Sequence, residues 1–105
     1  MPLTHDFKEI IRARAQRDHK FRQALLREAV GSILNGDLDT GKAVLRDYVN
    51  ATVGFQNLEK STQIPAKSLM RMLSPKGSPS VANFSIILAV LQEAEGVHFE
   101  VSLRR

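Results

Sequence analysis

Two long basic side chains, Lys67 and Arg71, lie four residues apart in a segment otherwise rich in apolar residues. On a helix, residues four apart project from the same face, one turn above the other. Lysine and arginine can donate hydrogen bonds to O6 and N7 of guanine, so such a face could contact base edges in a major groove. The alternative is that both side chains only solvate a surface helix.

The flanking residues predict two short helices separated by a three-residue turn, a spacing typical of a DNA-reading helix-turn-helix. The first helix should begin near residue 55 and turn Leu58 and Ser61 inward, while Ile64 fills the turn. Pro65 suits the start of the second helix, where its missing N–H removes no hydrogen bond. The inward side of that helix carries an apolar stripe with helical spacing, formed by Leu69, Met72 and Leu73.

Further helices are expected on both sides of this pair. Upstream, apolar residues recur with helical period in three segments that end near residues 16, 35 and 50. Asp18 is a suitable N-cap for the second of these, and Asp39 or Thr40 for the third. Downstream, a loop rich in serine, glycine and proline spans residues 74–79. A last helix should begin after Ser80 and end at Gly96.

The chain has 105 residues, 43% of them hydrophobic and 25% charged, which fits one small globular domain. Cysteine is absent, which excludes disulfides, thiolate metal sites and cysteine nucleophiles. The first residues lack the pattern of a signal peptide, and no apolar run approaches the length of about 20 residues that crossing a bilayer requires. We therefore expect a soluble, cytoplasmic protein.

The net charge of +4 is unevenly distributed. Residues 1–27 hold seven basic against three acidic residues, and residues 58–79 hold four against one, whereas residues 28–57 and 80–105 are net acidic. A basic surface attracts nucleic-acid phosphates in a salt-dependent way. The basic stretch at residues 8–22 can equally be the solvated face of a helix.

The last ten residues change period. Val97, Phe99, Val101 and Leu103 alternate with polar residues, and a period of two is typical of a half-buried strand. Because the sequence predicts no second strand, a single strand at residues 96–105 would have to pair with another copy of the chain, which makes these four residues dimerisation candidates. The alternative is a frayed or extended tail that packs on the body of the protein.

Signals for enzyme chemistry are absent from the sequence. His5, His19 and His98 lie far apart in different elements, without a cluster of acidic residues at metal-ligand spacing. We therefore expect a protein that is not an enzyme and that uses no metal or cofactor.

The segment from Val53 to Val90 resembles the lambda-repressor-like (Cro/CI-type, or XRE) helix-turn-helix, and is most similar to the addiction-module antidote (antitoxin) branch. The matching residues are Gly54-Phe55, Leu58, Thr62-Gln63-Ile64, Ser68 to Ser74, Gly77-Ser78-Pro79 and Ile86 to Leu91. With the upstream helical lead-in, the resemblance covers about residues 24–95. It implies a helix-turn-helix bundle with its DNA-binding core at residues 51–95. Together with the N-terminal helices at residues 1–50 and the single C-terminal strand predicted from the alternation at 96–105, the sequence predicts one mainly α domain.

The resemblance also implies DNA-contacting positions. The start and second turn of the recognition helix match base-reading places, and the preceding helix N-terminus and the loop match phosphate-anchoring places. These candidate DNA-binding residues are Ala66, Lys67, Ser68 and Arg71 for bases, and Gln56, Asn57 and Lys76 for phosphates. Two residues depart from the family pattern: Glu59 stands where alanine is preferred, and Gln63 where the turn usually has glycine.

The sequence thus predicts a DNA-binding transcriptional regulator, a repressor that binds a palindromic operator as a homodimer. The resemblance implies, more specifically, an antitoxin that represses its own operon and has a RelE-like ribonuclease toxin as its partner. The alternative is a protein–protein interaction module that keeps the fold and no longer reads DNA. Glu59 and the acidic middle segment favour that alternative, whereas Lys67, Arg71 and Lys76 favour the regulator.

Overall fold

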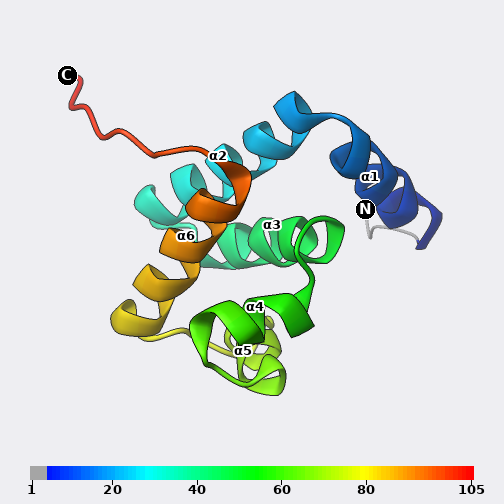
Figure 1. Ribbon diagram of the computed structural model, residues 1–105. Coiled ribbons are helices and arrows are strands. Elements are labelled where there is room, and N and C mark those ends of the chain that lie inside the picture. The colour runs from blue at the N-terminus through cyan, green and yellow to red at the C-terminus, as the bar shows by residue number, and fades with distance from the viewer. Residues whose placement is uncertain (1–4) are drawn as a thin grey trace.

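The structure is a computed structural model that describes residues 5–105, and over that range it forms six α-helices (Figure 1). They are α1 (His5–Arg17), α2 (His19–Leu34), α3 (Leu38–Ala51), α4 (Phe55–Thr62), α5 (Ala66–Met72) and α6 (Val81–Glu95). The predicted mainly helical architecture is confirmed. Within the described range, no helix is long and apolar enough to span a membrane.

The predicted C-terminal strand is wrong, because residues 97–105 form an extended tail without strand structure. The first backbone N–H groups of the tail bond to the end of α6: Val97 donates to the carbonyl of Gln92, and Phe99 donates to the side-chain oxygen of Gln92, 2.8 Å away. Val97 and Phe99 pack against the core, whereas Val101 and Leu103 are 84% and 97% exposed. An extended segment lying on a helical body alternates like a strand, which explains the error.

Most helix boundaries follow local capping. The Asp18 carboxylate accepts hydrogen bonds from the N–H groups at the start of α2, and the Ser80 hydroxyl does the same for α6, as expected from the sequence. The N-cap of α3 is Asp37, which accepts from the N–H of Thr40, so the predicted caps of that helix were two or three residues late. Gly96 ends α6 in the left-handed conformation, with a φ of 73°.

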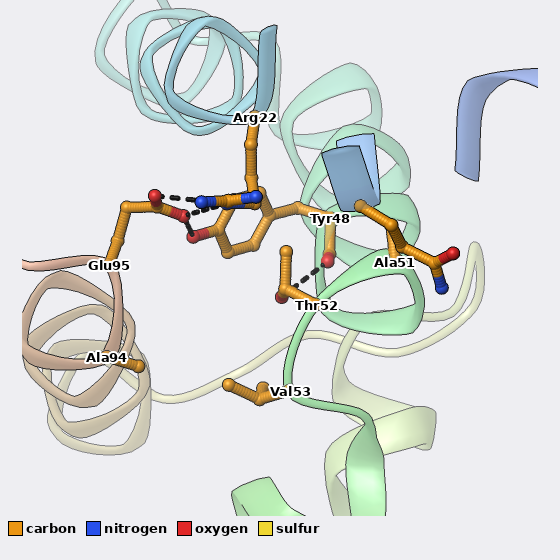
Figure 2. Close-up of a pocket in the computed structure, with 8 residues that line it drawn as sticks. Arg22, Tyr48, Ala51, Thr52, Val53, Ala94 and Glu95 are labelled. Atoms are coloured by element: carbon orange, nitrogen blue, oxygen red, sulfur yellow. Dashed lines mark hydrogen bonds and ion pairs between the residues drawn. The ribbon is translucent and has the colours of Figure 1, made fainter. Parts of the chain in front are cut away.

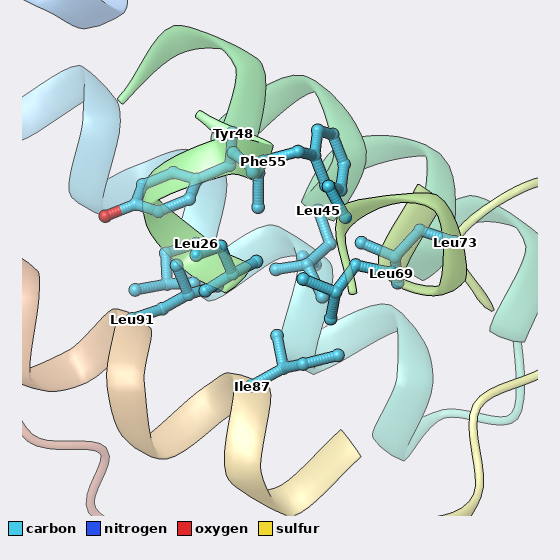
Figure 3. Close-up of a cluster of buried hydrophobic side chains, with 12 residues drawn as sticks. Leu26, Leu45, Tyr48, Phe55, Leu69, Leu73, Ile87 and Leu91 are labelled. Atoms are coloured by element: carbon cyan, nitrogen blue, oxygen red, sulfur yellow. The ribbon is translucent and has the colours of Figure 1, made fainter. Parts of the chain in front are cut away.

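One hydrophobic core joins five of the six helices (Figure 3). Its fully buried side chains include Leu26 of α2, Leu45, Tyr48 and Val49 of α3, Leu58 of α4, Leu69 of α5, and Ile87 and Leu91 of α6. The predicted inward stripe of α5 is confirmed for Leu69, while Leu73 is buried just after that helix and Met72 is half-buried. Ser61 is exposed instead of inward, because the inward positions of α4 are Phe55, Leu58 and Thr62.

The arrangement of the helices leaves α4 and α5 together at one end of the molecule (Figure 1). α3 runs through the centre and contacts α1, α2 and α4. Gly41 allows α2 and α3 to approach closely, since a Cβ at this position would collide with the Ile33 side chain. The two short helices are therefore carried on a packed frame of longer ones.

Candidate nucleic-acid interface

The connection between α4 and α5 is a tight turn at residues 63–65. Gln63 ends α4 in the left-handed conformation, with φ 64° and ψ 21°, and it is the one non-glycine residue with positive φ within residues 5–105. A side chain in this conformation costs about 1 kcal/mol, which accounts for the glycine preference of similar turns. The turn nevertheless has the predicted length of three residues. The Thr62 hydroxyl accepts a hydrogen bond from the N–H of Ile64 and stabilises it further.

Glu59, the other departure from the family pattern, has a structural role in this turn. Its carboxylate oxygen Oε1 lies 2.6 Å from the backbone nitrogen of Ala66 and accepts a hydrogen bond from it. Pro65, at the N-cap of α5, provides no side-chain cap. Glu59 therefore caps α5 from the neighbouring helix, and its negative charge lies at the positive end of the α5 dipole.

The outer face of α5 presents the two cations singled out in the sequence. Lys67 and Arg71 are both exposed, while Leu69 on the opposite side is fully buried. Ser68 is half-buried at the edge of this face. Ala66 is only 5% exposed and belongs to the core cluster, so its methyl group faces the protein interior and is not available to a base.

The N-terminus of α4, a helix that packs against α5, provides further candidate contacts to phosphate. Gln56 and Asn57 are exposed there, as expected for phosphate-anchoring residues. The Asn57 amide nitrogen donates to the carbonyl of Val53, 2.8 Å away, and so braces the preceding loop. Gly54, the N-cap, has no side chain, and within the described chain no side-chain hydrogen bond caps this helix. Its first N–H groups are therefore available to an anion.

The loop after α5 exposes Lys76, the predicted loop contact to phosphate. Beneath it lie two cations of α3 that the sequence did not assign to the site. The Lys42 ammonium bonds to three carbonyl oxygens of this loop, and Arg46 Nη1 donates to the carbonyl of Leu73 at 2.6 Å. The sequence gives only a weak indication of this role. Lys42 lies three residues before Leu45, on the inward stripe of its helix, so helical periodicity alone could have indicated its burial.

The N-terminal basic stretch lies mostly on α1, which is separate from α5 in the fold (Figure 1). Arg12 pairs with Glu9 at 3.5 Å, and Arg14 lies 3.8 Å from an Asp18 carboxylate oxygen and stacks on the Phe21 ring. Both basic groups thus interact with residues of α1 and of the start of α2. This placement favours the interpretation that α1 has a solvated basic face.

A partly buried polar cluster joins α2, α3 and α6 (Figure 2). Arg22 Nε donates to both oxygens of the Glu95 carboxylate, at 2.8 and 3.0 Å, and the Tyr48 hydroxyl donates to the same carboxylate. Arg22 also donates to the carbonyl of Ala15, which ties the end of α1 to this cluster. A cavity of about 390 Å³ lies beside these groups. The three side chains satisfy one another, so we assign them a structural role.

The pKa values in this cluster follow from its burial and its hydrogen bonds. Burial raises the pKa of the Glu95 carboxyl, but the hydrogen bonds from Arg22 and Tyr48 outweigh it, and the resulting pKa lies below the usual value. Burial, together with the hydrogen bond to Glu95, raises the pKa of the Tyr48 phenol well above its usual value. The cluster is therefore a partly buried ion pair with a neutral phenol at neutral pH.

Compared with known proteins, the chain matches no family model, no curated protein and no solved structure. The functional inference therefore depends on the residues and their geometry. Of the predicted DNA-binding residues, α5 exposes Lys67 and Arg71, the loop exposes Lys76, and the start of α4 exposes Gln56 and Asn57.

Proposed function

We propose that this protein is a sequence-specific DNA-binding regulator, and that α5 is its recognition helix. The observation that carries the proposal is the geometry of α5: Lys67 and Arg71 project from one exposed face, and Leu69 anchors the opposite face in the core. The anchored side fixes the orientation of the helix, and the two cations can donate to guanine O6 and N7 in a major groove. The N-terminus of α4 and Lys76 would bind phosphates on either side.

The proposal includes two copies of the chain acting together. One helix of seven residues with two long cations contacts too few bases for the about 4–10 kcal/mol that separate specific from non-specific binding. Since the C-terminal strand is absent, we assign the contact between copies to an apolar groove of about 440 Å³ between α2 and α6. Leu34 and Val81, in the groove lining, are 74% and 88% exposed, and a second copy would cover them.

Sedimentation tests this contact. The wild type should be a dimer at micromolar concentration, and Leu34→Glu should be a monomer with unchanged helix content, because a carboxylate in an apolar contact is strongly unfavourable. Ala24→Glu, on an exposed position of the same helix, is the matched control and should remain a dimer. A wild-type monomer, or a dimeric Leu34→Glu variant, would exclude the groove as the interface.

We also propose, from the resemblance to addiction-module antidote proteins, that the DNA target is the operator of the protein's own operon in the cytoplasm, and that a RelE-like toxin is the partner. A neighbouring reading frame that encodes a short basic protein supports this role. If that frame stops growth when expressed alone, and growth returns on co-expression with this chain, the antitoxin role holds; lack of rescue counts against it.

The alternative, an interaction module that does not read DNA, has lost part of its support. Two of the acidic residues that favoured it have structural roles: Glu59 caps α5, and Asp37 of the acidic middle segment caps α3. Selection of bound sequences from a random DNA pool decides between the two functions. Enrichment of one palindromic motif supports the regulator, whereas a pool that stays random supports the alternative.

A further inference from the structure

The Lys42 side chain is almost fully buried, with 3% of the residue exposed, at the point where α3 faces the loop that follows α5. Its ammonium nitrogen lies 3.0 Å from the carbonyl oxygen of Ser74, 3.4 Å from that of Pro75 and 2.6 Å from that of Gly77. The ammonium group can donate three hydrogen bonds, so these three carbonyls match its donors. The loop is thus folded around a positive charge.

A buried ammonium is unfavourable unless it is well bonded, so this arrangement indicates a specific task. The nearest carboxylate, Asp39, is 3.7 Å away, and its side chain is 90% exposed, which makes the ion pair weak. The main partners are therefore backbone carbonyls just beyond the C-terminus of α5. That end of a helix carries partial negative charge, and a cation there stabilises it.

A second cation of α3 holds the same end of α5. Arg46, one turn after Lys42, donates from Nη1 to the carbonyl of Leu73, the C-cap residue of α5. The loop itself is compact: a Cβ at Gly77 would collide with the carbonyl of Arg71, and the Ser74 hydroxyl donates to that carbonyl at 2.7 Å. Arg71 is thus connected to Lys42 through its own backbone and the loop.

We propose that Lys42 is a positioning residue for DNA recognition: its ammonium fixes the C-terminal end of α5, and thereby the direction in which Arg71 points. This inference rests on the proposed DNA-binding function. Lys42 cannot contact DNA itself because it is buried. Its loss should therefore affect the choice between sequences, while the electrostatic attraction to phosphates, supplied by exposed cations such as Lys76, remains.

The experiment compares wild type, Lys42→Met and the exposed-lysine control Lys60→Met. Binding to the DNA selected from the random pool and to scrambled DNA is measured by fluorescence anisotropy at several salt concentrations, with circular dichroism as a check of folding. Lys42→Met should bind the selected DNA about tenfold more weakly or worse, as for the loss of one base contact. Its affinity for scrambled DNA and its salt slope should equal those of wild type.

A second variant tests the ammonium group itself, because an added amine can refill the site and restore folding and binding together. Lys42→Ala removes the atoms of n-propylammonium, so adding n-propylammonium chloride should restore binding to the selected DNA, whereas sodium chloride of equal ionic strength should not. No difference between the two salts would overturn the proposal.

Other outcomes also overturn it. If wild type discriminates between the DNAs and folded Lys42→Met discriminates equally well, the positioning role fails while the proposed function stands. If the salt slope of Lys42→Met falls, or both DNAs lose affinity equally, Lys42 acts on phosphates or on overall stability instead. If wild type itself does not discriminate, the proposed function fails, and with it the role of Lys42.

Discussion

The Glu59 carboxylate accepts a hydrogen bond from the backbone N–H of Ala66, 2.6 Å away, and so joins α4 to the start of α5 across the turn. Glu59→Ala removes this cap and leaves the backbone N–H of the buried residue Ala66 without its acceptor. We expect the free energy of unfolding to fall by about 0.5–2 kcal/mol, as for other helix caps. Urea denaturation followed by circular dichroism measures the change.

A second variant, Glu59→Gln, distinguishes the hydrogen bond made by the Glu59 side chain from its negative charge, and Glu93→Ala is the control. Glu59→Gln keeps an acceptor oxygen and should recover part of the lost stability, since only the interaction with the helix dipole is weakened. Glu93→Ala, at an exposed position of α6, should change stability by less than about 0.5 kcal/mol. A Glu59→Ala protein as stable as the wild type would show that the cap is unimportant.

Gln63 should be replaceable by glycine with a gain in stability. Its φ of 64° is unfavourable for a side chain, and glycine adopts this conformation freely. Gln63→Gly also removes the hydrogen bond from its amide to the carbonyl of Lys60 and makes the unfolded chain more flexible. We expect a net gain of up to about 1 kcal/mol in the free energy of unfolding. A measured loss would mean that the amide bond and chain entropy outweigh the backbone conformation.

The Arg22–Glu95 ion pair should make stability depend on pH. The pKa of Glu95 in the folded protein lies below its usual value of 4.5, so its contribution is fully present above that pH and disappears as the pH falls through the folded-state pKa. Arg22→Met leaves the carboxylate buried without its cation. We expect this variant to lose about 3 kcal/mol at neutral pH.

Comparing wild type with Arg22→Met at acidic pH separates the effect of protonating Glu95 from that of protonating the other carboxyl groups. Once Arg22 is gone, burial raises the pKa of Glu95, and the variant is helped when the carboxyl becomes protonated. The difference in unfolding free energy between wild type and Arg22→Met should therefore shrink between about pH 6 and about pH 3. A constant difference over this range would contradict the assignment.

Substitutions at two neighbouring apolar residues of the tail, Val101 and Phe99, should have different effects on stability. Val101 is exposed, so Val101→Pro should change the unfolding free energy by less than about 0.5 kcal/mol and leave the oligomeric state unchanged. Phe99 packs against the core, and Phe99→Ala should lower the unfolding free energy by about 1–2 kcal/mol. Equal sensitivity at both positions would mean that the outer part of the tail is also docked.

The sequence predicted the helices well because their signals are local. Helical periodicity, Asp18, Ser80 and Gly96 act within a few residues of the helix ends that they determine. The tail was wrongly predicted to be a strand because alternation of apolar and polar residues indicates only that one side of an extended segment is covered. Whether a neighbouring strand or a helix covers it depends on tertiary packing, and here the end of α6 supplies both the contact and the hydrogen bonds.

Sequence patterns also did not predict which charged side chains lie on the inward sides of the helices. Arg22, Lys42 and Glu95 each lie on the inward side of their helix, three or four residues from a buried leucine. In the sequence, Arg22 counted only toward a basic stretch, because its partner Glu95 is 73 residues away. Glu59 favoured an interaction module that does not read DNA, because its acceptor role appears only when the turn brings it to Ala66.

The most direct test of the proposed function measures the affinity of Lys67→Ala and Arg71→Ala for selected and scrambled DNA by fluorescence anisotropy at several salt concentrations. Each variant should lose about 1–3 kcal/mol on the selected sequence alone and tolerate substitution at one base position. Lys76→Ala, the control, should weaken binding to both DNAs and lower the salt slope by about one phosphate. If Lys67→Ala and Arg71→Ala instead weaken both DNAs equally, α5 does not read bases, and the account of α5 as a recognition helix is wrong.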